Sequence, residues 1–574
     1  MPGFFVCDSP CGITLKNLYP DTCTAEELTL PGKTVKRATL RKFLNDKAFG
    51  RSDRGIAIGE GVLLNKQELF DRYGADTVEE LLWKMYAARG ERFAEELRGP
   101  YSCALYAAAS DRWLVYTNHT GESPVFYLLR DGIFCAGSQI NYILDACRER
   151  GIALSFDERA AYELLTLGFL ESDRTCAREI RRLCGGTYLR VEHGVGKVCE
   201  YHRFRKDPER FAGRSEDEMI EEFDAAFRRA VALEYGKDEE YGLRHLTDMS
   251  GGLDTRMGAW VSHVLAPRQL QLITYCRAGY LDEIIAKEIA EYWHDRLLVK
   301  ALDDASFLYD IDETVFLLGG TSIYSGITGG KHMLESLNMS RFGLEHTGQI
   351  GGGVLGSPYH SMKDHEGPCR RIYYSGRLAN RLEDSGWRDH FEDNETYLIH
   401  TRSLRGANNT SLLRRNYTEP VSPFAEADAL QLIIDIPVEY RVGHEFYKKW
   451  ILAKYPEAAG FRWENIVGKI TDPPALVLAQ KVLYKGKGKL MSRLGRPEYD
   501  TFNMNPMDHW FSRRADIRSR MDEYAKKGFE LLPGDVSDTL VSDMKEMYEK
   551  GSTVEKTMVL TVLGAAKLIF SAQA

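Results

Sequence analysis

Short apolar runs separated by turns fill the first 200 residues and predict β-strands. Asp131-Gly132 stands between two of these runs, and Asp-Gly in that position is typical of a hairpin. The apolar residues between 78 and 86 recur instead at helical spacing. Many strands with few helices predict an α+β layered domain. The strand-like runs are residues 3–7, 54–64, 101–106, 113–117, 125–129 and 133–135.

A change of pattern near residue 210 predicts a second domain. Residues 203–217 are highly charged and hold a proline and a glycine, which is typical of a boundary segment. Ser215 and Glu218 form a capping-box pattern in front of a helical apolar repeat. Strand-like and helix-like runs then alternate, which indicates a parallel sheet with crossover helices, and the last third of the chain is mostly helical. We expect domains at residues 1–203 and 215–574.

Composition and charge narrow the class of protein. Hydrophobic residues make up 44% and charged residues 28% of the chain, as in folded proteins. The net charge of −9 argues against nucleic acid as a partner, because phosphate binding needs a basic surface. The most apolar segment, residues 558–570, is too short for a membrane span of about 20 residues, so we expect a buried terminal helix and no membrane partner. The first ten residues lack a secretory n-region and the eleven cysteines form no C-x-x-C pair, which predicts a cytoplasmic protein.

The sharpest chemical signal is Ser250-Gly251-Gly252-Leu253-Asp254-Thr255, between a predicted strand and a predicted helix. Two glycines allow a tight turn with exposed N–H groups, and the helix adds the positive end of its dipole, so such a turn binds an anion such as pyrophosphate. Ser250 and Thr255 add hydroxyl donors, and Asp254 can hold a magnesium ion that bridges phosphates. The alternative is a turn that needs glycine for its geometry alone. Its place after a parallel strand favours a ligand site.

This hexapeptide resembles the S-G-G-x-D-S pyrophosphate loop of the asparagine synthetase family, which includes β-lactam synthetases and lasso-peptide cyclases. Segments of the first domain resemble the family's N-terminal glutaminase-type domain in the same order: 58–60, 65–69, 99–101, 118–121 and 124–127. The resemblance implies an Ntn-hydrolase-like layered domain, followed by an α/β domain that binds ATP and Mg²⁺ and ends in a helical part. It also implies adenylation of a substrate carboxylate with release of pyrophosphate.

The residues of the glutaminase reaction depart from the family. Its catalytic cysteine directly follows the initiator methionine, and this chain has Pro2 there. The family's oxyanion-stabilising asparagine falls on Ile58 in this comparison. Loss of a nucleophile and an oxyanion donor removes hydrolysis, so we expect a degenerate glutaminase-like domain. A start displaced to Cys11 would restore a nucleophile only after removal of residues 1–10.

A second glycine-rich segment extends the resemblance in the ligase domain. Thr347 and Gly348 match the nucleotide-contacting start of the family's S-G-[ED]-G-x-D-E-L-x-G motif. Its acidic residues are absent, because Gln349 and the glycines at 352–353 replace them. We expect Thr347 and Gly348 to contact the nucleotide, with a plain glycine-rich loop as the alternative.

Two catalytic candidates follow from the resemblance farther along the chain. Glu419 fits the start of E-x-R-x-P-F-L-D and is a candidate acceptor-site carboxylate, with a solvated loop acid as the alternative. Lys469 lies in the region of a family lysine that stabilises charge on the adenylated intermediate, with a surface lysine as the alternative. Asp282-Glu283 is read as a pair of acids favoured in the first turn of a helix. The basic stretch 481–496 is expected to be a flexible loop, with closure over the triphosphate as the alternative.

Together these features predict an AMP-forming, ATP-dependent amide ligase that adenylates a carboxylate and transfers it to an amine without its own glutaminase activity. The expected substrates are a small-molecule or peptide carboxylate and an amine. A glutamine-hydrolysing asparagine synthase-type enzyme and a non-catalytic pseudoenzyme or scaffold are the alternatives. The sequence leaves open a homodimer or a pathway partner protein.

Overall fold

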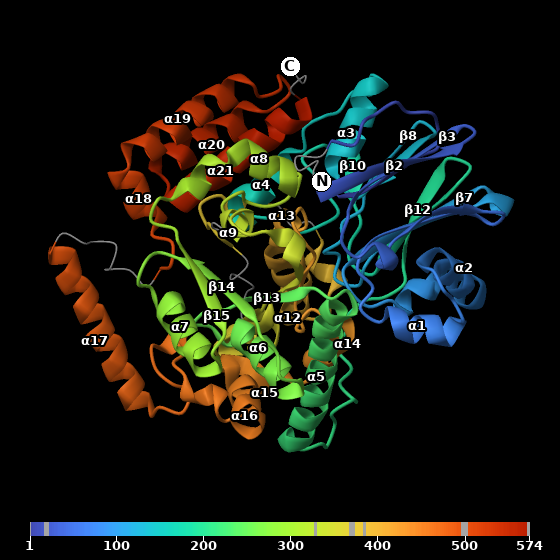
Figure 1. Ribbon diagram of the computed structural model, residues 1–574. Helices are drawn as coiled ribbons and strands as arrows, with labels where there is room; N and C mark the ends of the chain where they lie inside the picture. The colour runs from blue at the N-terminus through green and yellow to red at the C-terminus, as the bar shows by residue number, and fades with distance from the viewer. Residues whose placement is uncertain are drawn as a thin grey trace.

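The computed structural model describes residues 2–16, 22–326, 330–366, 373–382, 386–494 and 503–570. These residues form two antiparallel six-stranded sheets in the first 200 residues and one parallel five-stranded sheet after them, as Figure 1 shows. None of the described helices is long and apolar enough to cross a membrane. The mixed α/β architecture that the sequence predicts is confirmed.

The two N-terminal sheets stack face to face. One has the strand order β10-β8-β9-β1-β3-β2 and the other β12-β11-β7-β6-β5-β4. Their bounds are β1 Gly3–Cys7, β2 Cys23–Leu30, β3 Lys33–Leu40, β4 Ala48–Ser52, β5 Gly55–Gly61, β6 Tyr101–Ala107, β7 Arg112–Thr117, β8 Phe126–Arg130, β9 Ile133–Gly137, β10 Ile180–Arg182, β11 Thr187–Glu192 and β12 Val195–Glu200.

The alternating side-chain directions along β1 show how the sheets and helices of the N-terminal half are layered. Phe4 and Val6 point into the core between the sheets, whereas Phe5 and Cys7 point to the outer face, where helices cover the sheet. The outer face of the second sheet is covered by α2 (Val78–Arg89). The order is therefore helix, sheet, sheet, helix.

The third sheet has the strand order β15-β14-β13-β16-β17, with every pair parallel. The chain moves outward from β13 to β15 and then returns to the other side of β13 to form β16, so the strand order reverses between β13 and β16. Open α/β sheets bind ligands at such a reversal, at the carboxyl ends of the strands. The bounds are β13 Arg244–Asp248, β14 Gln271–Cys276, β15 Arg296–Ala301, β16 Phe342–His346 and β17 Pro420–Val421.

Helices on both faces of this sheet include α5 (Glu216–Glu240), which begins at the capping box of Ser215 and Glu218 that the sequence predicts. The crossover helices α6 (Leu253–Leu265) and α7 (Leu281–Trp293) follow β13 and β14. The other helices are α1 Lys66–Tyr73, α3 Ile140–Glu149, α4 Glu158–Leu167, α8 Ile311–Leu318, α9 Gly330–Glu335, α10 Gly351–Val354, α11 Met362–Glu366, α12 Asn394–Leu398, α13 Ser411–Arg414, α14 Ala427–Asp435, α15 Val438–Arg441 and α16 Glu445–Lys454.

The chain ends in a helical layer that packs against α3, α4 and α8 in one apolar core. Its last helix, α21, is buried, as predicted for residues 558–570. The layer consists of α18 Met507–Arg513, α19 Ala515–Glu530, α20 Asp538–Lys550 and α21 Thr553–Phe570.

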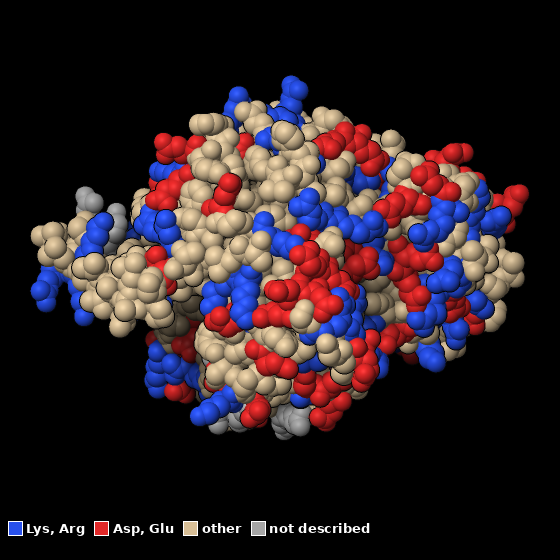
Figure 2. Space-filling model, turned by 90° about the horizontal axis from the view of Figure 1, so that it is seen from below, with Lys and Arg blue, Asp and Glu red and all other residues tan. Residues whose placement is uncertain are grey.

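The basic stretch 481–496 is not a loop where the structure describes it, so that expectation is wrong. Residues 481–493 belong to α17 (Pro474–Arg493), which projects from the body of the molecule in Figure 1 and at the left of Figure 2. The two glycines of this segment disfavour a helix, but their effect is outweighed by the high helix propensity of its Leu, Ala, Gln and Lys residues. Residues 495 and 496 lie outside the described part of the chain.

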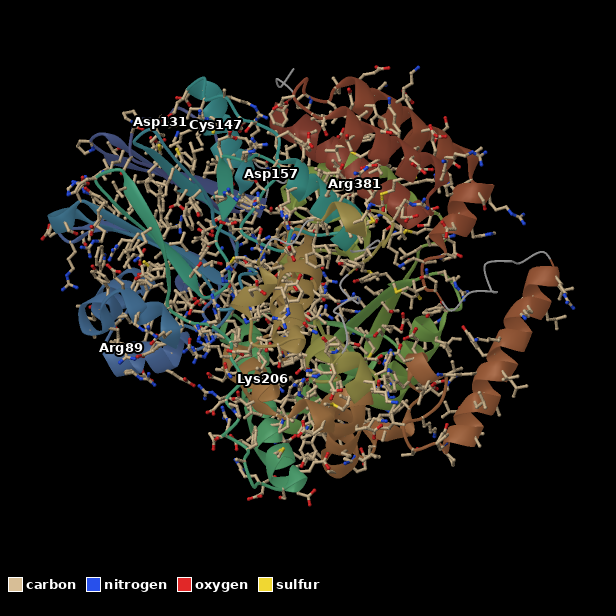
Figure 3. The ribbon with its side chains drawn as sticks, turned by 180° about the vertical axis from the view of Figure 1, so that it is seen from behind. Arg89, Asp131, Cys147, Asp157, Lys206 and Arg381 are labelled. Atoms are coloured by element: carbon tan, nitrogen blue, oxygen red, sulfur yellow. The ribbon has the colours of Figure 1, made fainter. Side chains whose placement is uncertain are left out.

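The charged segment that precedes α5 is bound to the ligase half. Lys206, labelled in Figure 3, forms ion pairs with Asp393 and Glu395 at the start of α12. Within the ligase half, Arg381, also labelled in Figure 3, pairs with Asp543 of α20 at 2.8 Å. The division at residues 1–203 and 215–574 stays a prediction.

Candidate functional site

A cavity of about 520 Å³ opens at the carboxyl ends of β13, β14 and β16, where the strand order reverses. The loop 250–255 and the segment 347–350 form two of its walls. The rest of the lining comes from Asp248, Met249, residues 273–275, Tyr280, Asp282, Arg414, Glu464, Asn503 and Met504. The structure therefore brings both glycine-rich motifs to one cavity.

The loop 250–255 is a strand-to-helix turn held by its own side chains. The Ser250 N–H donates to Thr255 Oγ1 at 3.1 Å, and the Gly252 N–H donates to Ser250 Oγ at 3.1 Å. Gly252 is the N-cap residue of α6 and supplies no side-chain cap. The N–H groups of the first turn of α6 are therefore left for an anion, which the helix dipole also favours.

The second loop lies directly against the first. A Cβ atom on Gly348 would lie 2.4 Å from the backbone nitrogen of Thr255, and one on Gly351 would lie 2.7 Å from Cγ of Asp254. A side chain at 348 would displace the backbone of the first loop, and one at 351 would displace the side chains of Asp254 and Phe424. This contact explains why the segment is rich in glycine, and it sets Thr347 and Gly348 beside the predicted phosphate loop.

Asp254 is the best-placed candidate for a metal ligand. Its Oδ2 accepts from the Gly352 N–H at 2.7 Å, and its Oδ1 accepts from the Tyr447 hydroxyl at 3.0 Å. Burial raises the pKa of Asp254 to about 6 against its ordinary value of 3.8. A divalent cation would offset this desolvation, so the carboxylate fits magnesium.

Sequence reasoning missed most of the charge in this cavity. Asp282 lines the wall and accepts from the Gly251 N–H at 2.8 Å, and burial raises its pKa to about 6. Glu464 lines the wall beside it and accepts from the Tyr280 hydroxyl at 2.6 Å. The acid at the first turn of α7 therefore does more than complement the helix dipole. Its strand-to-helix position was the signal that could have identified it.

The described part of the cavity wall carries four carboxylates, those of Asp248, Asp254, Asp282 and Glu464, and one guanidinium. That guanidinium, of Arg414, pairs with Asp248 at 2.9 Å and with Glu345 at 2.6 Å behind the wall. The cavity is therefore negative, and a polyphosphate would enter it together with a divalent cation rather than alone.

Glu419 does not line this cavity, and its role as an acceptor-site carboxylate stays a prediction. It directly precedes β17, and its backbone C=O accepts from the N–H of Glu345, the second-last residue of β16, at 3.1 Å. Its Oε2 lies 3.4 Å from the guanidinium of Arg415. Glu419 and Arg415 together face a small cavity of the N-terminal domain.

Lys469 is also outside the cavity wall. Its side chain is exposed, and its backbone N–H donates to Asp472 at 2.9 Å. Glu464 is the residue of this segment that reaches the cavity, because the turn that begins at Trp463 directs it toward Gly251. The structure therefore brings an acid to the wall where the resemblance implies a lysine.

The N-terminal domain has a cavity of only about 20 Å³ next to Pro2. Ile58, placed at the oxyanion position by sequence comparison, is instead buried between the two sheets. Glu60 and Gly61, two and three residues farther along β5, share the cavity with Pro2. The assignment of Ile58 is therefore corrected to Glu60. The thiol of Cys11 lies apart from this cavity and donates to Glu149 at 3.3 Å.

Comparisons with known proteins agree with this architecture. Residues 63–202 match a glutamine amidotransferase domain, which defines the class of the N-terminal half. Proteins described as putative glutamine-hydrolysing asparagine synthetases from Mycobacterium bovis and Mycobacterium tuberculosis are each 23% identical over 279 residues. The match covers 46% of this chain and 42% of each relative, so the chain spans less than half the length of these relatives. Together the two matches support an asparagine synthetase-family protein with an N-terminal amidotransferase domain.

Among solved structures, the glutamine phosphoribosylpyrophosphate amidotransferase from B. subtilis, complexed with ADP and GMP, is similar to 52% of this chain and 85% of its own. The TM-score is 0.23 and the identity 10%. A structure described as the allosteric regulatory enzyme of purine biosynthesis gives the same TM-score and identity, with 74% of its chain covered.

Proposed function

We propose that this protein is an ATP-dependent amide ligase that adenylates a substrate carboxylate and passes the acyl group to an amine. The observation that carries the proposal is the meeting of loop 250–255 with Thr347 and Gly348 around the uncapped first turn of α6. Relatives described as asparagine synthetases support an ATP-dependent C–N ligase as the general class.

In the proposed reaction, the first-turn N–H groups of α6 and the hydroxyls of Ser250 and Thr255 hold the β- and γ-phosphates. Magnesium held by Asp254 would neutralise the phosphate charge. An oxygen of the substrate carboxylate attacks the α-phosphorus, and the bond to pyrophosphate breaks. The amine then attacks the acyl carbon and loses a proton, and AMP leaves with the bonding electrons.

We further propose that the amine comes from a substrate or from free ammonia, and not from glutamine hydrolysed by this chain. The cavity beside Pro2 measures about 20 Å³, against about 520 Å³ for the nucleotide cavity on the same measure. Glu60 lines it with a carboxylate that only accepts when ionised, and Arg415, which is 3.4 Å from Glu419, contributes a guanidinium to the same cavity. The small volume and Pro2 at the place of the family's nucleophile support an inactive glutaminase-type domain.

A nucleotide-binding protein without ligase activity is the second candidate. The described wall of the large cavity holds no lysine, and Glu464 occupies part of it. Stabilisation of the negative charge that develops on an acyl-adenylate would therefore depend on magnesium, on backbone donors and on Arg414, whose guanidinium is already paired with Asp248 and Glu345. This observation favours a binding role if no carboxylate supports pyrophosphate exchange.

The test is exchange of labelled pyrophosphate into ATP with a panel of amino-acid, peptide and small organic carboxylates. The ligase exchanges with at least one carboxylate, and Asp254→Ala abolishes the exchange. Glu291→Ala, which removes an exposed acid from α7, is the matched control and leaves the exchange unchanged. ATP binding without exchange for any carboxylate would favour the second candidate, and absence of ATP binding would exclude both.

A further inference from the structure

A buried cluster of two imidazoles and a carboxylate lies behind the nucleotide cavity, where the proposed function does not use it. Asp238 is on the last turns of α5, His245 is in β13 and His346 ends β16. One ligand atom from each of these side chains lies within 4.8 Å of the other two. All three side chains are nine-tenths or more buried.

The carboxylate of Asp238 is oriented for two imidazoles at once. Its Oδ1 accepts from the Leu344 N–H at 2.7 Å, which fixes the carboxylate plane. Its Oδ2 lies 2.8 Å from Nδ1 of His245 and 2.8 Å from Nε2 of His346. Two nitrogens and one oxygen therefore converge from three different elements of the fold.

The far side of each imidazole faces a second carboxylate. Oε2 of Glu234 lies 3.8 Å from Nδ1 of His346, and Oε1 of Glu239 lies 4.0 Å from Nε2 of His245. Histidines that bind metals direct their other ring nitrogen to a carboxylate or carbonyl, which fixes the tautomer and raises ligand basicity. The ring of Tyr235 stacks on His346 at 3.7 Å between centroids and holds its plane.

Two buried atoms in this cluster have no hydrogen-bond partner, Oε2 of Glu234 and Nδ1 of His346. A buried carboxylate oxygen without a partner carries a desolvation penalty of about 1–3 kcal/mol or more. A cation on the Asp238 side of His346 would draw the Nδ1 proton toward Glu234 and strengthen that contact. The contact between these two atoms is long, 3.8 Å, as expected of a ligand set without its ion.

We propose that Asp238, His245 and His346 bind a divalent transition metal of the zinc type. Two imidazole nitrogens with one carboxylate oxygen suit Zn²⁺ and its neighbours better than magnesium or calcium. Ligands about 2.0–2.2 Å from a tetrahedral zinc ion are about 3.3 Å apart. The 2.8 Å contacts therefore have to open by about half an ångström. His245, which keeps a small exposed edge, gives the ion a path of entry.

The metal would join α5 to the two strands that carry the nucleotide loops. His346 is followed directly by Thr347, and β13 ends two residues before Ser250. Binding would fix the distance between these loops from behind. The inference rests on the cluster alone and holds whether or not the protein is a ligase.

The experiment uses the full chain, stripped with a chelator, loaded with Zn²⁺ and desalted before its metal content is measured. Wild-type protein should retain about one equivalent of zinc and unfold at a higher temperature than the stripped protein. His245→Gln should retain less than about a tenth of that amount. His263→Gln is the matched control, since His263 contacts Asp295 at 2.9 Å but belongs to no three-ligand cluster in the described residues.

Cobalt identifies the ligands. Co²⁺ in the proposed site should give visible d–d bands without a thiolate charge-transfer band, and the bands should be lost in His245→Gln. A thiolate band would place the ion at cysteines such as Cys7 and Cys135, whose sulfurs lie 3.1 Å apart, and would overturn the proposal. Equal zinc retention by wild type and His245→Gln, or none in wild type, would overturn it as well. These results would leave the cluster as a hydrogen-bonded triad.

Discussion

The two halves of the molecule hold cavities of very different size and lining. The C-terminal sheet holds a cavity of about 520 Å³ with glycine-rich loops and an uncapped helix start. The N-terminal sheets hold about 20 Å³ beside Pro2, with Glu60 in the wall. The proposed nucleotide site uses backbone N–H groups, two hydroxyls and one carboxylate for magnesium, whereas a glutaminase needs one particular nucleophile. A fold by itself therefore does not decide which of the two halves carries a reaction.

The largest effect is expected from Asp254→Ala. Loss of this carboxylate removes the proposed magnesium ligand, and we expect magnesium-dependent ATP affinity to fall by roughly 100-fold or more. Isothermal titration calorimetry with and without magnesium measures it, and far-ultraviolet circular dichroism checks the fold. Glu291→Ala should bind as wild type does. Unchanged affinity in Asp254→Ala would exclude loop 250–255 as the magnesium-nucleotide site.

Gly348→Ala tests the contact between the two loops. The added methyl group would lie 2.4 Å from the Thr255 backbone nitrogen, so the loops must separate. Overpacking of this kind typically destabilises by about 1–3 kcal/mol, and we expect ATP affinity to fall with it. Gly460→Ala is the control, because no atom lies within 4 Å of its added Cβ. Equal thermal midpoints and affinities for the two variants would contradict the packing described here.

ATP binding should depend on pH through Asp254 and Asp282, whose pKa values burial raises to about 6. Their raised values favour the folded state fully below about pH 3.8, and that stabilisation is lost as pH rises through about 6. Magnesium needs the ionised form, so the thermal shift caused by magnesium-ATP should be small at pH 5 and should grow up to pH 7. Asp254→Asn should flatten this profile. A wild-type shift that does not change between pH 5 and pH 7 would refute the assignment.

Lys469→Ala distinguishes the catalytic role that the family resemblance implies for Lys469 from the exposed position that the structure shows. A lysine that stabilises charge in the transition state would lower kcat by about 10²–10³ when removed. The exposed position of Lys469 predicts a change of less than about threefold. Pyrophosphate exchange at saturating ATP measures the difference. A loss of two orders of magnitude would show that the segment after Trp463 closes over the cavity during catalysis.

The sequence was sufficient to predict the strands with a clear apolar pattern and the helix that begins with a capping box. β1, the strands β13 to β15 and the capping box of α5 were predictable, because alternation and cap chemistry are local. Strands β2 and β3 were missed. β2 is a half-exposed edge strand with polar residues at four of its eight positions, so it lacks the apolar run on which the prediction depended.

The candidate site was predictable where it is made of a contiguous motif. Residues 250–255, after a predicted parallel strand, and residues 347–348, assigned by the resemblance, line the same cavity. Glu419 lies outside this cavity, and no local pattern of the sequence indicates that its side chain pairs with Arg415 instead. Ile58 and Glu60 are two residues apart in β5, so their side chains point to the same face of the sheet. The sequence therefore could not show which of them lies beside Pro2.

The central claim is that this chain has kept a nucleotide site and lost glutamine hydrolysis, and one preparation can test both parts. Purified full-length protein is given magnesium-ATP and glutamine, and bound ATP and released glutamate are measured together. The account predicts ATP binding that depends on Asp254 and no glutamate above the level of a protein-free control. Steady glutamate release that is lost in Cys11→Ala, together with ATP binding that is unchanged in Asp254→Ala, would contradict it.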